Sequence, residues 1–327
     1  MTEVRVGFVG AGGNARGHMN RLSEIEGVNI LAICDVVEET AAEAAETHSA
    51  RSYTDHHDML DEVEIDALYV SVPPFAHTDA EIMAAQAGIH LFVEKPVVLD
   101  MDTGLEILEA IEEAGVLSCV GYQLRLMDTS QRLRAYLADR QVAMISSHRW
   151  GGLPGTPWWR VMEQSGGQLH EQTTHQLDLM RFCTGDEVVE VCARYDRLTM
   201  DDVEGITIPD SQGVLMTFAS GTIATIVTSP MMTQGGGKSD INFLLRDQII
   251  GWSTQQISVT GVQAPELEGE PEERPNIDQA FMQAIREDDR SLIPCSYEDG
   301  LRTCDVTLAA NRSAESGRPV APQMAAE

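Results

Sequence analysis

The sequence is poor in lysine and has no long apolar segment. Lys95 and Lys238 are its two lysines, and the formal net charge at pH 7 is −30. A surface this acidic repels phosphate backbones and anionic lipids, which argues against nucleic acids and membranes as partners. The apolar runs are short, so we expect no transmembrane span. The start of the chain shows neither the basic nor the apolar region of a secretory signal.

Paired cysteines are also lacking. The six cysteines form no CxxC pair, and no Cys/His cluster has the spacing of metal ligands. This pattern predicts buried, reduced thiols, no bound metal and a cytoplasmic location. With 43% hydrophobic residues in a chain of 327, the protein can bury a core, and its length favours two domains.

Residues 1–121 alternate strand and helix signals. Buried-type apolar runs such as Val4–Val9 and Val28–Cys34 are separated by helical segments of about 10 to 15 residues, the pattern of βαβ units with a parallel sheet. We therefore predict an α/β domain over residues 1–121.

Residues 122–327 have a different pattern. Six β-rich runs between 142 and 252 are separated by turn residues, which predicts a mainly antiparallel sheet in an α+β domain. One helix over about 171–183 interrupts the strands, and residues 265–275 read as a surface loop. Helices over about 277–286 and 298–315 close the chain, and we expect the last one to pack back at the domain interface.

A glycine-rich segment follows the first predicted strand. Gly10–Ala15 reads GxGxxA, a form of the dinucleotide fingerprint: Gly10 allows a tight turn, and Gly12 lets the backbone approach a pyrophosphate. Asp35 ends the second strand, where a carboxylate binds ribose hydroxyls and repels a 2′-phosphate. No cation follows in Val36–Glu39, so we predict NAD rather than NADP.

Two further segments carry candidate chemistry. Lys95 lies in Glu94-Lys95-Pro96, directly after a buried strand, and a lysine can share its proton where an arginine cannot. Glu171 and His175 are four residues apart on the predicted helix, so they share a face, and a carboxylate beside an imidazole suits a general base. A surface ion pair is the competing interpretation. On the same helix, Asp178 and Arg181 have the spacing of an ion pair.

These elements together resemble the Gfo/Idh/MocA oxidoreductases. The matching segments, in order and spacing, are Gly10–His18, Pro73–His77, Glu94–Pro96, Arg125, Gly166–Asp178 and the tail Ser296–Gly300 through Gly317–Val320. The resemblance covers nearly the whole chain. It implies a Rossmann domain followed by an open-faced antiparallel sheet, an active site between the two, and a homodimer or homotetramer built through that sheet.

The resemblance also implies residue roles. Lys95 falls on the family's catalytic lysine, His175 on its histidine base, and Glu171 where many members have aspartate. We expect His175 to accept the proton of a substrate hydroxyl and Lys95 to stabilise the developing alkoxide. The residues expected at the cofactor are Gly10, Gly12, Gly13, Asn14, Ala15, Asp35, Pro73, His77, Glu94 and Lys95.

The expected substrate is a sugar or polyol. Besides Lys95, Glu171 and His175, the candidate contacts are Arg125, Trp158, Trp159 and Arg160, each of which also has a purely structural interpretation. We expect a neutral substrate, because Lys95, Arg125 and Arg160 are the cations we can place near the site. Two alternatives stay open: an NAD-dependent glycosidase without net redox, and an NAD-sensing regulator without turnover.

Overall fold

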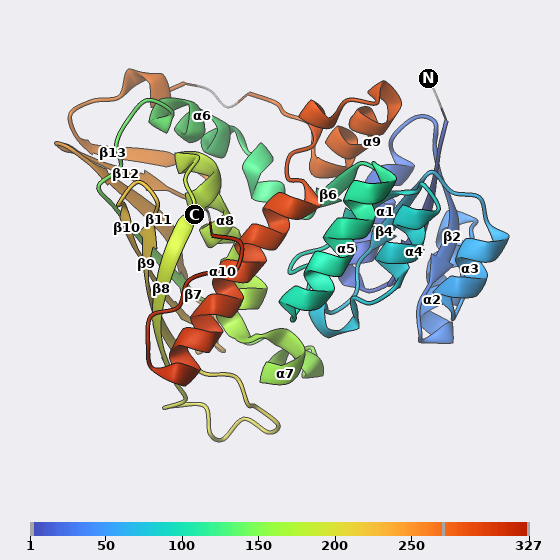
Figure 1. Cartoon of the computed structure of the whole chain (residues 1–327), viewed down its shortest axis with the longest axis horizontal. Helices are drawn as coiled ribbons and strands as arrows, with labels where there is room; N and C mark the ends of the chain where they lie inside the picture. The colour runs from blue at the N-terminus through green and yellow to red at the C-terminus, as the bar shows by residue number, and fades with distance from the viewer. Residues whose placement is uncertain (1–2, 270–271, 326–327) are drawn as a thin grey trace. The chain divides into compact units, whose positions relative to one another are not determined.

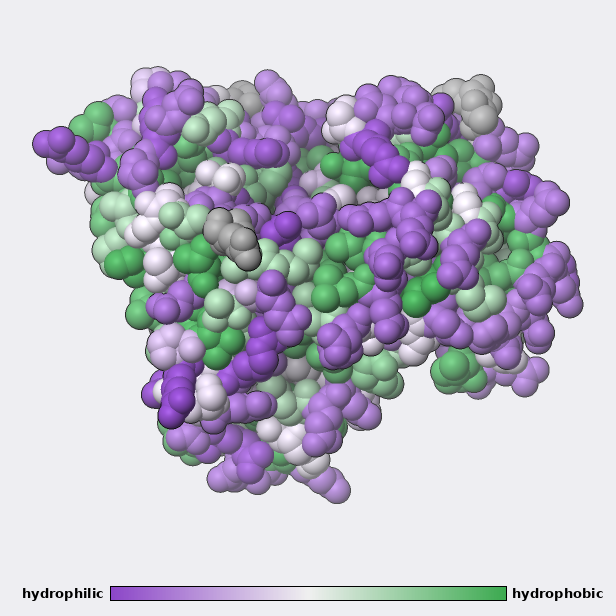
Figure 2. Space-filling model, in the orientation of Figure 1, coloured by the Kyte–Doolittle hydropathy of each residue, from purple (hydrophilic) through white to green (hydrophobic). Residues whose placement is uncertain are grey.

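The computed structural model describes residues 3–269 and 272–325, and the chain forms two compact units (Figure 1). The first unit contains residues 1–123 and 275–301, and the second contains residues 124–274 and 302–327. Hydrophilic side chains dominate the face shown in Figure 2, in keeping with the acidic composition. No helix in the described ranges is both long and apolar enough to span a membrane.

The first unit is built on a six-stranded parallel sheet with the order β3-β2-β1-β4-β5-β6. All residues of β4 are buried, as expected for a parallel strand with helices on both faces. The strand order reverses between β1 and β4, and ligands bind at such a point in open α/β sheets. The strands are β1 Val4–Val9, β2 Val28–Cys34, β3 Arg51–Tyr53, β4 Ala67–Val70, β5 His90–Val93 and β6 Ser118–Val120.

The helices of this unit come from both ends of the chain. They are α1 Gly13–Ser23, α2 Glu38–His48, α3 His56–Glu62, α4 Ala80–Gln86, α5 Met101–Ala114 and, after the second unit, α9 Ile277–Glu287. Helix α9 joins this unit because Phe281 packs against the rings of Tyr69 and Phe92, with centroids 5.9 and 5.8 Å away. The simple division at residue 121 therefore differs from the observed units, which assign residues 275–301 to the first unit.

The second unit is built on a seven-stranded sheet with the order β13-β12-β11-β7-β10-β9-β8. Its strands pair antiparallel except for β7 with β10. This confirms the predicted fold class. The strands are β7 Met144–Trp150, β8 Val188–Asp196, β9 Ser211–Phe218, β10 Ile223–Ser229, β11 Lys238–Leu245, β12 Gln248–Trp252 and β13 Ile257–Gly261.

Helices cover one face of this sheet (Figure 1). The hydrophobic core contains Leu133, Met180 and Ala309 from three different helices, together with inward residues of the strands. The helices are α6 Asp128–Leu137, α7 Met162–Ser165, α8 Thr174–Thr184 and α10 Tyr297–Ser316, whose residues 297–301 belong to the first unit.

Three local predictions need correction. The edge strands β3 and β13 were not predicted, because they are short and largely exposed and so lack an apolar pattern. The helix predicted from residue 171 is preceded by a π-helical turn, Leu169–Thr173, and α8 itself begins at Thr174. In the predicted loop 265–275, Pro265–Leu267 forms a 3₁₀ turn with Leu267 buried, and residues 270–271 lie outside the described residues.

Candidate active site

The glycine-rich turn after β1 fits a dinucleotide. Gly10 has a φ of +94°, and a Cβ there would lie 2.2 Å from the Ser71 carbonyl oxygen, so this turn requires glycine. A Cβ on Gly12 or Gly13 would meet nothing within 4 Å. Helix α1 starts at Gly13, and Gly12 places no side chain over its first N–H groups. The helix start is therefore open, as pyrophosphate binding requires.

Asp35 is fixed beside this turn. Its Oδ2 accepts a hydrogen bond from the Ala11 N–H at 2.8 Å, and its Oδ1 accepts one from the Val37 N–H at 2.9 Å. Each oxygen keeps a further lone pair, so the carboxylate can still bind ribose hydroxyls. The residues at this sheet edge fit NAD and would hold its pyrophosphate and adenosine ribose.

The loop after β4 brings Pro73 and His77 to the same sheet edge. His77 Nδ1 lies 2.5 Å from Glu81 Oε1, and both side chains are fully enclosed. Within the described residues, His77 Nε2 is buried without a hydrogen-bond partner. Glu81 therefore fixes the imidazole ring of His77, and Nε2 is the ring nitrogen left without a hydrogen bond in the part of the chain that the structure describes.

Glu94 and Lys95 follow β5. Glu94 is buried, its Oε1 lies 2.8 Å from His18 Nε2, and its Oε2 accepts the Lys95 backbone N–H at 3.2 Å. The other His18 nitrogen lies 2.6 Å from Asp278 Oδ1. A Cβ on Gly121 would lie 2.5 Å from Glu94 Oε1, so glycine there leaves room for the carboxylate. The backbone that carries the half-buried Lys95 is thus held by a buried network.

This role of His18 and Asp278 does not follow from the sequence. His18 ends the matching segment Gly10–His18, and Asp278 is 260 residues away in the chain. No local sequence pattern around either residue predicts the contact, because it depends on α9 joining the first unit.

His18 makes stability depend on pH. Burial lowers the pKa of its imidazolium, but the hydrogen bonds to Asp278 and Glu94 outweigh burial and raise the pKa from 6.5 to about 9. Because the folded pKa is the higher one, the charged form stabilises the fold fully below pH 6.5, and this contribution is lost as the pH rises through 9. The free energy of unfolding should therefore fall by roughly 3 kcal/mol over that interval.

Urea denaturation at pH 6, 7.5 and 9 measures this effect. His18→Gln should flatten the pH dependence across the interval. His48→Gln is the matched control, because the pKa of His48 is lowered by burial and the group titrates below the interval. An equally steep pH dependence in His18→Gln would contradict the assignment.

In the second unit, Glu171 and His175 lie where two helical geometries meet. Glu171 is buried within the π-helical turn, and the half-buried His175 lies in the first turn of α8. Such π-helical turns occur often at functional sites. The α-helical spacing used to place the two side chains on one face therefore does not describe this segment.

Arg125 forms a buried bidentate ion pair. Its Nε and Nη2 donate to the two oxygens of Asp178 at 2.8 and 2.5 Å. The predicted ion pair of Asp178 with Arg181 is therefore wrong, and Arg181 instead donates to both oxygens of Glu187 at 2.8 and 2.7 Å. Asp178 therefore pairs with an arginine from another segment of the chain and not with the arginine one helical turn away.

Trp158, Trp159 and Arg160 lie in a 3₁₀ turn before α7. Trp159 is 3% exposed in a cluster with Met200 and two isoleucines, and Trp158 is half-buried beside it. Arg160 is half-buried, and its Nε has no hydrogen-bond partner within the described residues.

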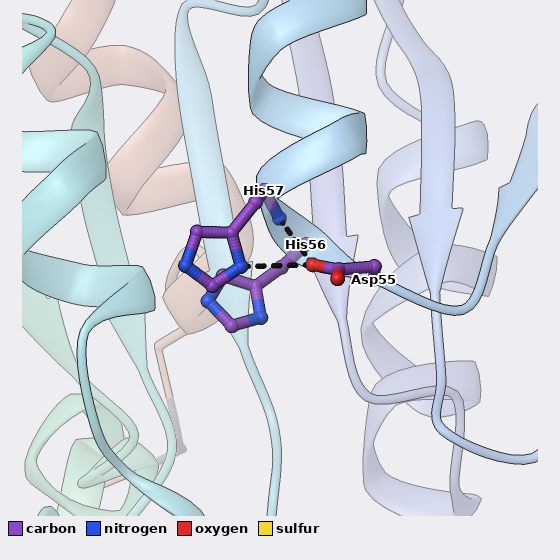
Figure 3. A group of neighbouring side chains, drawn as sticks. All are labelled: Asp55, His56 and His57. Carbon is purple, nitrogen blue, oxygen red and sulfur yellow. Dashed lines mark hydrogen bonds and ion pairs between the residues drawn. The ribbon is translucent and has the colours of Figure 1, made fainter.

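One surface cluster has metal-ligand chemistry. Asp55, His56 and His57 at the start of α3 bring ligand-type atoms within 4.8 Å of one another (Figure 3). Asp55 Oδ1 already accepts the His57 N–H at 2.9 Å as the helix N-cap, and it lies 2.8 Å from His57 Nδ1. These hydrogen bonds explain the arrangement without a metal.

Comparison with known proteins decides the family. Residues 4–122 match the family model described as "Oxidoreductase family, NAD-binding Rossmann fold", and residues 140–251 match the "GFO/IDH/MocA C-terminal domain". The chain belongs to the Gfo/Idh/MocA family. It is an NAD-dependent oxidoreductase, and the relatives found are named as oxidoreductases, dehydrogenases and a reductase.

Several Gfo/Idh/MocA proteins are similar over most of the chain. Myo-inositol 2-dehydrogenase of Thermotoga maritima is 26% identical over 238 residues, which are 71% of this chain and 70% of that protein. The uncharacterised oxidoreductase YrbE of Bacillus subtilis is 27% identical over 71% of this chain and 69% of its own length. The WlbA dehydrogenase of Bordetella pertussis, solved with NADH and UDP-GlcNAcA, has a TM-score of 0.86 at 22% identity over 99% and 100% of the two chains.

Proposed function

We propose that this Gfo/Idh/MocA enzyme interconverts a hydroxyl and a carbonyl group on a small sugar or polyol. The observation that carries the proposal is Lys95, whose backbone is bound to buried Glu94 at the sheet edge that also bears the Gly10 turn and Asp35. The carboxyl ends of parallel strands line the ligand crevice in such sheets. Related inositol 2-dehydrogenases support a polyhydroxylated substrate.

Three residues carry the proposed chemistry. When bound, NAD accepts a hydride from the carbon that bears the hydroxyl. His175 takes the hydroxyl proton as general base, and Lys95 donates a hydrogen bond to the same oxygen and stabilises its developing charge. Glu171 orients His175 or holds a neighbouring hydroxyl.

Further side chains are proposed to hold the substrate. Trp158 and Arg160 are half-buried and can present a ring face and N–H donors to a sugar. Arg125 and Trp159 belong to the same proposed set and are anchored by Asp178 and by the hydrophobic cluster around Met200.

A screen for NADH formation tests the proposal. The enzyme is mixed with NAD⁺ and with pyranoses, glycosides, cyclitols or sugar acids. The near-ultraviolet absorbance of NADH is followed, chromatography of the products detects glycoside cleavage, and a titration measures NAD binding. We expect turnover with at least one class of hydroxyl compound. Cleavage of a glycoside without net NADH formation would support the glycosidase alternative instead. NAD binding without turnover of any compound would support the regulator.

We also propose that the enzyme is a homodimer or homotetramer built through the sheet of the second unit. This sheet exposes apolar side chains at alternate strand positions, the pattern of a face that packs on another surface. A cavity of about 720 Å³ on the second unit is lined partly by Trp150, Met231 and Met232. The exposed strand residues are Met144, Trp150, Leu215, Ile223, Val227, Leu244 and Ile249.

A charge on this face should break the assembly. Val227→Asp is expected to weaken self-association by roughly tenfold or more, because an unpaired carboxylate would be buried at the interface. Light scattering across a concentration series measures the molar mass. Leu105→Asp on α5 is the matched control, since Leu105 is similarly exposed, at 39% against 44% for Val227, but lies in the first unit. A wild-type monomer would contradict the proposal.

A cytoplasmic location is proposed from the thiols. The six cysteines are thiols outside any disulfide, and five of them are buried. Reduced cysteines are typical of compartments that keep thiols reduced.

A further inference from the structure

A second cavity in the second unit lies at the end of β7. It measures about 650 Å³, within the range of small-molecule sites. The end of β7 and the loop after it form one wall of the cavity, and the start of β11 forms another. Gln172 of the π-helical turn also lines the cavity. Its lining residues are Arg149, Trp150, Gly151, Gly152, Leu153, Pro154, Gln172, Gly236, Gly237, Lys238 and Ser239.

Arg149 brings an uncompensated positive charge to this cavity. Its Nη2 donates to the Gln172 side-chain oxygen at 3.2 Å, and within the described residues no carboxylate lies at ion-pair distance from its guanidinium. The side chain is half-buried, and burial lowers the pKa of its guanidinium. By contrast, Arg125 and Arg181 of the same unit each have a bidentate carboxylate. A half-buried cation without a carboxylate partner carries a desolvation free energy that an anionic ligand would offset.

Glycines keep the space around this guanidinium open. A Cβ on Gly151 would lie 3.4 Å from Arg149 Nη1, so a side chain at this position would contact the guanidinium. Gly237 has a φ of +139°, and a Cβ there would lie 2.4 Å from the Trp150 carbonyl oxygen, so only glycine fits this close approach of β11 to β7.

Lys238 places a second cation at the cavity. Its Nζ lies 3.1 Å from Asp240 Oδ2, so its charge is largely compensated. The excess charge of the cavity is therefore the Arg149 guanidinium, in a chain whose formal net charge is −30. A guanidinium offers N–H groups in a planar fork that matches a carboxylate or a phosphate.

The cavity adjoins the proposed catalytic segment. Gln172, which accepts the Arg149 hydrogen bond, directly follows Glu171 and precedes His175 by three residues. We propose that Arg149 binds a carboxylate or phosphate group of the substrate, so that the enzyme acts on an acidic sugar or polyol. This inference rests on the proposed function and names its substrate class. It revises the expectation of a neutral substrate, which counted Lys95, Arg125 and Arg160 but not Arg149.

Matched substrates and variants test this role. The catalytic efficiency with NAD⁺ is measured for a neutral sugar or polyol, its carboxylic acid and its phosphate ester, and the two acidic forms distinguish the two anions. Wild-type enzyme should prefer an acidic form, and the preference should weaken as salt rises. Arg149→Gln should raise the KM for that form roughly 30-fold and change the KM for the neutral form less than about threefold. Arg149→Lys should give an intermediate value.

Control variants separate this role from a structural one. Arg246→Gln removes the same charge from a side chain that is 97% exposed, and it should leave every KM unchanged. The inference would be overturned if Arg149→Gln lost catalytic efficiency equally on acidic and neutral substrates. A change in the molar mass of this variant by light scattering would overturn it too. A wild-type preference for the neutral form would overturn it as well and leave the proposed function intact. If no sugar or polyol tested reacted with NAD⁺ in its neutral, carboxylic acid or phosphate form, the proposed function itself would be contradicted.

Discussion

Replacing Lys95 by alanine is expected to lower kcat by roughly two orders of magnitude or more, the usual cost of removing a donor that stabilises a developing oxyanion. The affinity for NAD should stay within about twofold of wild type. The fixed parts of the cofactor site are the Gly10 turn and the Asp35 carboxylate, and neither depends on the lysine side chain. Steady-state kinetics and a titration with NADH measure the two quantities.

Two further variants separate the role of the Lys95 ammonium group from a general effect of removing positive charge. Lys95→Arg keeps a cation but cannot share its proton, so it should recover only a small part of the lost turnover. Arg246→Ala removes a cation from an exposed turn and should leave kcat unchanged. Turnover like that of wild type in Lys95→Ala would remove Lys95 from the mechanism.

The double variant Asp35→Ser/Val36→Arg should shift the ratio of catalytic efficiencies towards NADP by roughly two orders of magnitude. The change removes a carboxylate that repels a 2′-phosphate and adds a cation beside it. Val36 is 90% exposed, so an arginine at this position meets no packed neighbours. Efficiencies with NAD⁺ and NADP⁺ are compared for wild type and variant on one substrate.

Single variants divide the Asp35 effect into its two parts. Asp35→Ser loses repulsion but gains no cation, and a serine oxygen can still accept a hydrogen bond from the Ala11 or Val37 N–H group. We expect it to lower the efficiency with NAD⁺ without giving high efficiency with NADP⁺. A wild-type enzyme that already prefers NADP⁺ would contradict the role of Asp35.

Local sequence patterns predicted the parts of the molecule that depend on neighbours in the chain. The buried runs of β1 and β4 and the glycine turn at Gly10 are short-range features, and the structure has them where the patterns place them. The alternation in β9 and β10 likewise follows from one buried and one open face of the sheet.

Contacts between distant segments could not be predicted in this way. The His18–Asp278 contact depends on α9 returning to the first unit, and no local pattern signals that return. Arg125 rather than Arg181 binds Asp178, because tertiary placement overrides helical spacing. Arg149 was missed because an arginine in a strand resembles any solvated cation until its neighbours are known.

In the proposed reaction, the enzyme moves a hydride from a carbinol carbon to NAD⁺. The most direct measurement uses the first substrate found in the screen, labelled with deuterium at the carbon that bears the hydroxyl, and mass spectrometry of the NADH formed. One deuterium is expected in each NADH from labelled substrate, and none is expected when unlabelled substrate reacts in deuterated water. Product that keeps the deuterium, or that loses it to solvent, would contradict hydride transfer to NAD⁺.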